Sequence, residues 1–261
     1  MTSKNPVKAR HGLSLNVVMT IAVVVVAVLV VGGIMLFGGS DTTTGGTGGT
    51  GDSGDAAREA GGSGGGVSTA VLAPDGSHEL TSAADGKVTI VEFLDYQCPA
   101  CAGYFANVTS KVEKDYAGKV TFVVRNYPLD SHPLAVPAAR AAEAAAEQDK
   151  FSEMYHLIYQ NYQEWAVAPD GQQLSDDTAR AGQVFLGYAE RLGLDTAKFT
   201  ADLDSPAVQA RIDKDTADGK TAGVSGTPTI FVNGQKFEAT GDTFADVDRQ
   251  LRELVDRELA G

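Results

Sequence analysis

Residues 88–101 read VTIVEFLDYQCPAC, and this stretch decides the fold. Its first seven residues are mostly apolar and rich in β-branched side chains, and they have the length of a buried strand. Pro99 suits the first turn of a helix, where its missing N–H is not needed. Residues 102–116 then place apolar side chains on one helical face. We therefore expect a strand that leads directly into a helix, with both cysteines of the chain at the junction.

The residues that follow predict one more strand and then a long helical block. Residues 119–125 form a second apolar strand, and a strand, a crossover helix and a strand make a βαβ unit with parallel pairing. Between about residues 132 and 222 the patterns are all helical. They predict helices at 135–148, 150–162, 177–192, 195–203 and 206–221.

The remaining parts of the chain carry turn signals. Residues 228–238 predict a strand, the two-residue turn Asn233-Gly234 of the I′ type, and a return strand. Residues 243–259 form an amphipathic helical pattern. Before the first strand, Pro74-Asp-Gly76 is interpreted as a hairpin turn.

The N-terminal region predicts a membrane anchor. Residues 17–37 are uncharged and mostly apolar, and at 1.5 Å per residue they cross a hydrocarbon core of roughly 30 Å. A cleaved signal peptide is the alternative, but its apolar core usually has about 7–15 residues, and no Ala-x-Ala site follows this run. Residues 1–16 carry three basic residues and no acidic one, so the positive-inside rule places them in the cytoplasm.

Two segments follow the predicted transmembrane helix, and both then lie outside the cytoplasm. Residues 38–66 are rich in Gly, Ser and Thr, which predicts a disordered linker. Residues 67–261 form the folding unit, with 17 Lys and Arg against 30 Asp and Glu. This negative charge argues against a nucleic-acid partner, because a phosphate backbone would repel it.

The spacing of the two cysteines indicates redox chemistry. Cys98 precedes the first turn of the predicted helix, where the N–H groups and the helix dipole stabilise a thiolate, so it is the expected nucleophile. Cys101, one turn further on, is placed to attack a mixed disulfide at Cys98 and release the partner. A structural disulfide is an alternative, but so small a ring stabilises a fold little. A zinc site is another, and it would need two further ligands, for which His132 and His156 are weak candidates.

VEFLDYQCPAC at a strand–helix junction, with VSGTPTIFVNG (residues 224–234) far downstream, resembles the DsbA-type thiol-disulfide oxidoreductases of the thioredoxin superfamily. The resemblance covers about residues 75–259. It implies an α/β thioredoxin fold with an all-helical insertion at about 132–222. It also implies a cis Thr227-Pro228 bond that faces the cysteine pair, and a buried Glu92 beneath the active site. One departure is the dipeptide Pro-Ala between the cysteines, where the best-studied oxidants carry a histidine.

Several neighbours of the cysteines have expected roles of their own. A carboxyl within an apolar strand has a raised pKa and can exchange protons with a nearby sulfur, although Glu92 at a strand edge would be solvated and idle. Asp95 is expected to begin the turn, and Tyr96 to line a surface where a substrate peptide docks. Gly226 is expected to supply the backbone freedom that the cis bend needs.

These observations predict a membrane-tethered, extracytoplasmic oxidoreductase that introduces disulfides into reduced secreted proteins. Its only redox group is the disulfide between Cys98 and Cys101, which a membrane redox partner reoxidises. We expect a monomer. A reductase or an isomerase is the alternative among enzymes, although an isomerase usually needs paired sites on a dimer. A tethered chaperone or binding module is the alternative outside enzymes, and replacing both cysteines would leave its activity intact.

Overall fold

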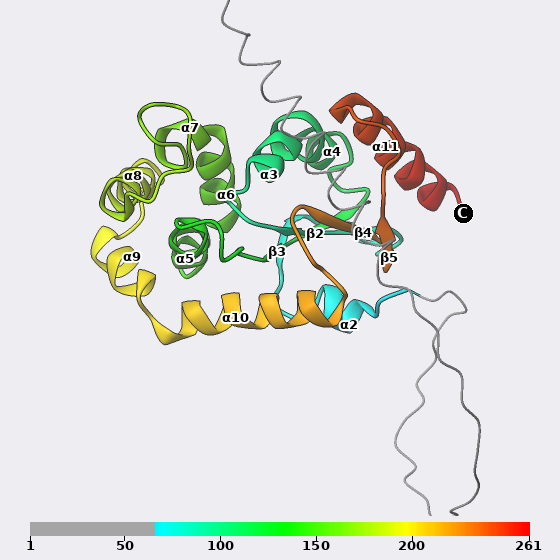
Figure 1. Cartoon of the computed structure of the whole chain (residues 1–261). Coiled ribbons are helices and arrows are strands. Elements are labelled where there is room, and N and C mark those ends of the chain that lie inside the picture. Colours follow the sequence, from blue (N-terminus) through cyan, green and yellow to red (C-terminus); the bar gives the residue numbers. More distant parts are fainter. Residues whose placement is uncertain (1–65) are drawn as a thin grey trace, which may run out of the picture. The chain divides into compact units, whose positions relative to one another are not determined.

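The strand before the cysteine pair lies in the middle of a five-stranded sheet in the computed structural model, which describes residues 66–261 (Figure 1). The predicted cytoplasmic tail at 1–16, transmembrane helix at 17–37 and linker at 38–66 lie outside the described residues, apart from Gly66. Within the described part of the chain, no helix is both long and apolar enough to cross a bilayer.

The sheet combines parallel and antiparallel pairing. Its strands, in the order β1-β3-β2-β4-β5, are β1 (His78–Thr81), β3 (Thr121–Asn126), β2 (Thr89–Leu94), β4 (Thr229–Val232) and β5 (Gln235–Phe237). β2 and β3 are parallel, with Glu92 opposite Val124, which confirms the predicted βαβ unit. The other pairings are antiparallel. Because β2 is hydrogen-bonded on both sides, the cysteine-bearing loop after it has a fixed starting point.

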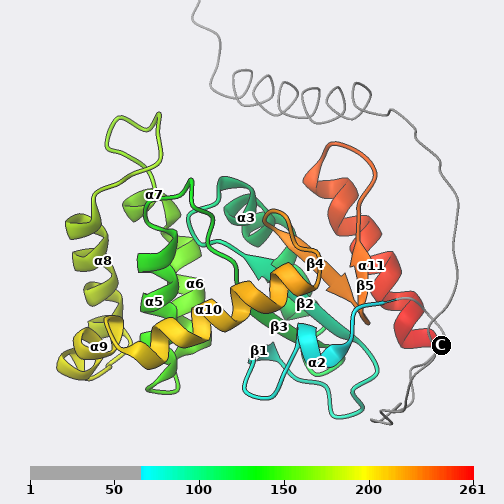
Figure 2. The ribbon, with the colours of Figure 1, turned by 60° about the horizontal axis from the view of Figure 1, so that its bottom comes forward.

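Helices cover both faces of the sheet (Figures 1 and 2). On one face lie α3 (Pro99–Tyr104), α4 (Ser110–Asp115) and α11 (Phe244–Ala260), which pack with Ile90 of β2 in one buried cluster. On the other face lie α2 (Thr69–Leu72) and α10 (Pro206–Thr221), on the side of Val91 and Phe93. Successive β2 side chains therefore enter different layers, as the twofold repeat of a strand requires.

The helical run after the cysteines starts where Pro99 predicts and contains an interruption. It begins at Pro99, with Cys98 before it and Cys101 in its first turn. Between α3 and α4 the chain forms a π-helical segment, η1 (Phe105–Thr109). There the Phe105 carbonyl accepts hydrogen bonds from the N–H and, at 2.6 Å, the hydroxyl of Ser110, five residues along. Such single π turns recur at functional sites.

The predicted helical block forms a second core beside the sheet. Its helices are α5 (Ala135–Ala146), α6 (Phe151–Gln160), α7 (Tyr162–Trp165), α8 (Thr178–Arg191) and α9 (Thr196–Leu203), followed by α10. Trp165, Phe185 and Phe199 are buried in the cluster that they share. α10 runs from this block onto the sheet (Figure 2), where Arg125 of β3 binds Asp215 at 2.7 Å. The block is thus joined to the sheet by a buried ion pair.

Local turn signals gave one correct and one wrong prediction. Asn233 and Gly234 have φ angles of 47° and 81°, as a I′ turn requires, and they join β4 to β5 as expected. Pro74-Asp-Gly76 does form a turn, closed by the bond from Ser77 N to Pro74 O at 3.0 Å. It joins α2 to β1 and is not a hairpin, because β1 pairs with the distant β3.

Candidate active site

Cys98 is the residue that caps the N-terminus of α3. Its backbone is extended (φ −64°, ψ 121°), and its N–H bonds to the backbone and side-chain oxygens of Asp95 at 3.1 and 3.2 Å. Its Sγ lies 3.5 Å from the carbonyl oxygen of Thr227. Cys101 lies one helical turn on and is 1% exposed, against 6% for Cys98. Both are unbonded thiols in this structure.

The two cysteines differ in acidity. A hydrogen bond from the Cys101 thiol is the largest cause that lowers the pKa of Cys98 to about 6, with smaller contributions from Thr227 and from the N–H groups of Ala100 and Cys101. Burial raises the pKa of Cys101 well above its ordinary value, and the bond to Cys98 adds to this. At neutral pH the pair therefore holds one thiolate, on Cys98, as the sequence predicts.

The loop before β4 supplies the opposite wall of the site. The Thr227-Pro228 bond is cis, which confirms the prediction. The Thr227 side chain helps to lower the pKa of Cys98, and its buried hydroxyl oxygen has no other hydrogen-bond partner within residues 66–261. The role expected for Gly226 is wrong. Its φ is not in the left-handed region, and a Cβ there would meet no atom within 4 Å, so the bend needs no glycine.

Glu92 lies in the centre of β2 and is 1% exposed, which excludes a solvated position at a strand edge. Burial raises its pKa from 4.5 to about 8, and the nearby charge of Glu113 adds to this. Its Oε2 has no hydrogen-bond partner in the described part of the chain. The charge of Glu92 in turn raises the pKa of Cys101. The charge of the carboxyl therefore reaches the buried sulfur.

Tyr96 does not line a docking surface. It is 1% exposed, and its ring packs against Tyr155 and Tyr159 of α6, with centroids 6.2 and 5.3 Å away. Periodicity could not show this, because the helical block that covers Tyr96 lies more than fifty residues further along the chain. The prediction failed because the tertiary arrangement of α6 decides the burial of this ring.

Asp95 and Gln97 do more than begin a turn. The Gln97 side chain accepts a hydrogen bond from Leu134 N (2.6 Å) and donates to the carbonyls of Ala166 (3.1 Å) and Ser175 (2.7 Å). The Asp95 carboxylate contacts His132, on the loop after β3. The turn before Cys98 is thereby tied to the helical block. An Asp three residues before the cysteine was a signal for the turn, but nothing local pointed to its distant partner.

The two histidines weighed as zinc ligands both bind carboxylates. His132 lies 2.7 Å from Asp95, and His156 lies 2.8 Å from Glu113. Among residues 66–261, no group of three or more His, Cys, Asp or Glu side chains is arranged to hold a metal ion. The cysteine pair therefore has no third protein ligand beside it in the described chain.

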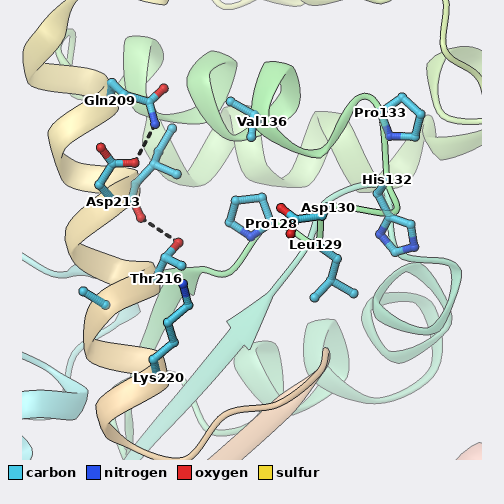
Figure 3. Close-up of a pocket in the computed structure, with 12 residues that line it drawn as sticks. Pro128, Leu129, Asp130, His132, Pro133, Val136, Gln209, Asp213, Thr216 and Lys220 are labelled. Carbon is cyan, nitrogen blue, oxygen red and sulfur yellow. Dashed lines mark hydrogen bonds between the residues drawn. The ribbon is translucent and has the colours of Figure 1, made fainter.

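A groove of about 580 Å³ borders the site on the side of His132 (Figure 3). One wall is the loop after β3, which carries Leu129 and His132, and the other is α10, with Asp213 and Lys220 (Figure 3). Both apolar and charged side chains line it. The groove gives solvent access to one edge of the active-site network.

The fold and the site define a protein with the thioredoxin fold of the DsbA type: a dithiol at the start of a helix, faced by a cis-proline loop, with a helical block beside the sheet. A family model described as Thioredoxin matches residues 81–253. The chain belongs to this thioredoxin family.

Solved structures with the same fold include an oxidoreductase and a thiol-disulfide exchange protein. Oxidised BdbD from Bacillus subtilis is 24% identical, with a TM-score of 0.59, over 76% of this chain and 97% of that one. A thioredoxin-like oxidoreductase from Silicibacter pomeroyi DSS-3 is 27% identical, with a TM-score of 0.56, over 75% and 99% of the two chains. The thiol-disulfide exchange protein α-DsbA2 from Wolbachia pipientis is 19% identical, with a TM-score of 0.56, over 72% and 90%.

Curated relatives of similar sequence are much longer proteins. The Na(+)/H(+) antiporter NhaA of Herminiimonas arsenicoxydans is 33% identical over 158 residues, which are 60% of this chain and 22% of that protein. The Na(+)/H(+) antiporter NhaA 3 of Salinispora tropica is 38% identical over 164 residues, 62% of this chain and 22% of that protein. The chain thus spans about a fifth of the length of these relatives.

Proposed function

We propose that this protein is an extracytoplasmic thiol-disulfide oxidoreductase that introduces disulfides into reduced secreted or cell-envelope proteins. The observation that carries the proposal is the unequal cysteine pair. Cys98 has a pKa of about 6 and Cys101 a strongly raised one, and the two lie at one helix start. A stable thiolate on Cys98 favours the reduced form of the pair, so the disulfide form is a strong oxidant.

The reaction begins with the Cys98–Cys101 disulfide. A client thiolate attacks the Cys98 sulfur, and Cys101 leaves as a thiolate that takes up a proton. A second client thiolate attacks its own chain's sulfur in the mixed disulfide and releases Cys98 as a thiolate. The client loses two electrons and the cysteine pair gains them. A membrane protein with an oxidised cysteine pair then accepts these two electrons and restores the disulfide.

Glu92 assists by moving the proton. When Cys101 leaves as a thiolate it is buried, and burial disfavours a charged sulfur. A carboxyl with a pKa of about 8 is largely protonated at neutral pH and is coupled to this sulfur. Glu92 therefore supplies the proton as the disulfide opens and accepts it again on reoxidation.

The membrane tether of the proposal rests on sequence. Residues 17–37 supply an apolar run of bilayer length, and the basic residues before it orient the catalytic unit outwards. An oxidising compartment also suits a protein that forms disulfides. The curated relatives are named Na(+)/H(+) antiporters, which work in membranes. We do not propose antiport for this chain.

Trapping the mixed disulfide tests this function. In Cys101→Ser the Cys98 thiolate can still attack a disulfide of an oxidised client, and the client adduct should persist on the full chain because no Cys101 thiol is present to displace the client; such adducts are visible on non-reducing gels and lost with reductant. Cys98→Ser is the matched control and should trap none. Equal trapping by Cys98→Ser, without trapping by Cys101→Ser, would reverse the two roles. If neither variant traps clients and the double variant keeps full cellular activity, the protein is a binding module.

A further inference from the structure

The Asp95 carboxylate links the backbone of the reactive cysteine to the loop after β3. It is 1% exposed. One oxygen accepts hydrogen bonds from the N–H groups of Gln97 (2.7 Å) and Cys98 (3.2 Å). The other accepts from the N–H of Leu129 (2.8 Å) and from Nδ1 of His132 (2.7 Å). Four donors thus satisfy both oxygens of this buried side chain, as a buried polar group requires.

His132 is the basic side chain of this arrangement. Within residues 66–261 it is the one side chain that forms a salt bridge with Asp95. The hydrogen bond to Asp95 is the largest cause that raises the pKa of His132 above its ordinary value, and the charge of Cys98 contributes in the same direction. The ring is 12% exposed and lines the groove beside α10 (Figure 3), so it can exchange protons with solvent.

We propose that His132 is a positioning residue that keeps Cys98 ionised, because its imidazolium balances the Asp95 carboxylate held beside the reactive turn. The turn needs the carboxylate, which binds the N–H of Cys98. A lone buried carboxylate at this place would repel the thiolate and raise its pKa. The imidazolium removes this conflict without loss of the hydrogen bonds. The inference deepens the proposed function and rests on it, because disulfide exchange is the reaction in which the Cys98 thiolate is used.

Other ionisable groups around His132 do not replace it. Tyr159 donates its hydroxyl to the Asp95 carbonyl at 3.2 Å, and Tyr162 donates to the Gln97 carbonyl at 2.6 Å. Burial raises the pKa of both phenols, so they stay neutral. Three exposed charges complete the surroundings, where solvent screens them: Asp130 on the same loop, and Asp213 and Lys220 on α10 across the groove.

His156 provides a matched comparison within the same chain. It forms the same kind of pair, 2.8 Å from Glu113, and links α6 to α4. Its pKa is also raised above the ordinary value: burial opposes the rise, and the hydrogen bond and charge of Glu113 cause it. Glu113 makes no hydrogen bond to either cysteine, so the loss of this second pair should leave the ionisation of Cys98 unchanged.

The thiolate of the reduced full chain can be titrated directly. Brief iodoacetamide alkylation at a series of pH values, with mass spectrometry of the Cys98 peptide, gives the midpoint of its ionisation. His132→Gln keeps a donor for Asp95 and removes the charge. We expect the midpoint to rise by about one pH unit and the alkylation rate at pH 5 to fall about tenfold. His156→Gln should keep the wild-type midpoint.

Two further variants separate charge from shape. Adding Asp95→Asn to His132→Gln removes both charges, and the midpoint should return towards the wild-type value. His132→Lys keeps a cation, and it should keep a low midpoint. An unchanged midpoint in a folded His132→Gln protein overturns the proposal, as does an equal rise in His156→Gln. If His132→Gln does not fold, the Lys variant decides, and a raised midpoint there overturns the proposal.

This titration needs neither a client nor a redox partner, so its result is independent of the proposed function. A raised midpoint in a protein that traps no client supports the role of His132 and counts against disulfide transfer to clients. An unchanged midpoint in a protein that does trap clients counts against the role of His132 and supports disulfide transfer to clients.

Discussion

Two acidic side chains, Glu92 and Asp215, are buried against opposite faces of the central sheet, and they differ in whether a cation is paired with them. Glu92 lies on the face beneath α4, where it has no cationic partner among residues 66–261 and a pKa of about 8. Asp215 of α10 lies on the other face, where it receives Arg125 Nε at 2.7 Å and the N–H of Asn126 at 2.9 Å. Arg125 and Phe93 are opposite each other in the register of β2 and β3.

The presence or absence of a paired cation distinguishes a carboxylate that supports the fold from one at the candidate active site. The Arg125 guanidinium is satisfied on all sides, because it also binds Asp218 and the carbonyls of Val71 and Leu72. Such a network joins α2, β3 and α10, and although burial raises the pKa of Asp215, the charge of Arg125 opposes that rise. An unpaired buried carboxyl instead lowers the stability of the fold, and chains tolerate such groups chiefly at sites that use their protonation. The unpaired group here is the one coupled to Cys101.

Breaking the paired side should have the largest effect. Arg125→Met leaves Asp215 buried without its cation and leaves two carbonyls without donors. We expect a loss of about 3–5 kcal/mol in the free energy of unfolding, measured in urea at neutral pH. The ionisation midpoint of Cys98 should not move. Adding Asp215→Asn should recover part of the loss. A loss below about 1 kcal/mol would contradict the importance given to this network.

Replacing the unpaired carboxyl of Glu92 should raise the free energy of unfolding instead of lowering it. The pKa of Glu92 is 4.5 ordinarily and about 8 when folded, so the folded state binds its proton more tightly. The stability that the folded state gains from holding this proton is therefore fully present below pH 4.5 and is lost as the pH rises towards 8. Glu92→Gln should be more stable than the natural chain by about 4 kcal/mol at pH 8, and the gain should vanish at pH 4.

Denaturant titrations at the two pH values measure this gain. A variant that is equally stabilised at both would show that shape, not charge, sets the difference. Glu92→Gln should also flatten the pH dependence of disulfide exchange, because the proton that Cys101 receives then comes from solvent. If the exchange profile keeps its shape, Glu92 has no part in proton transfer.

A change in the cis-proline loop should have the smallest effect, and it should alter only the pKa of Cys98. Thr227→Val keeps the shape and removes a hydroxyl that helps to lower the pKa of Cys98. The Cys98 midpoint should rise by about one pH unit or less, with little change in stability, because this hydroxyl has no other partner in the described chain. Thr229→Val is the control: its hydroxyl bonds to Gly226 O at 2.7 Å, so its loss should lower stability and leave the midpoint unchanged.

Local patterns predicted the parts of the site that are built from local structure. The apolar run before Cys98, the proline after it and the Asn-Gly turn each act over a few residues, and the βαβ unit, the helix start and the β4–β5 hairpin follow from them. The thioredoxin-type fold and the cis Thr227-Pro228 bond came instead from the resemblance of two motifs, and both agree with the structure.

What the sequence did not reveal depends on contacts between distant segments. Asp95 and His132 are 37 residues apart, and no periodicity links them. Tyr96 reads as an ordinary turn residue until α6 covers it. In the π turn after α3, both the N–H and the hydroxyl of Ser110 bond to the Phe105 carbonyl, and no periodicity indicates these bonds. The position of the cysteine pair was predictable because it depends on a local helix start, whereas the partner of Asp95 was not, because it lies on the distant loop after β3.

The central claim is that Cys98 and Cys101 transfer a disulfide to reduced proteins. It is tested by mixing the oxidised full chain with a reduced, unfolded protein that contains two thiols, quenching with acid, and counting free cysteines in both by alkylation and mass spectrometry. The account predicts that each new client disulfide appears with one dithiol on this chain, and that Cys98→Ser forms none. A client that stays reduced beside an unchanged Cys98–Cys101 disulfide, or equal oxidation by Cys98→Ser, would contradict it.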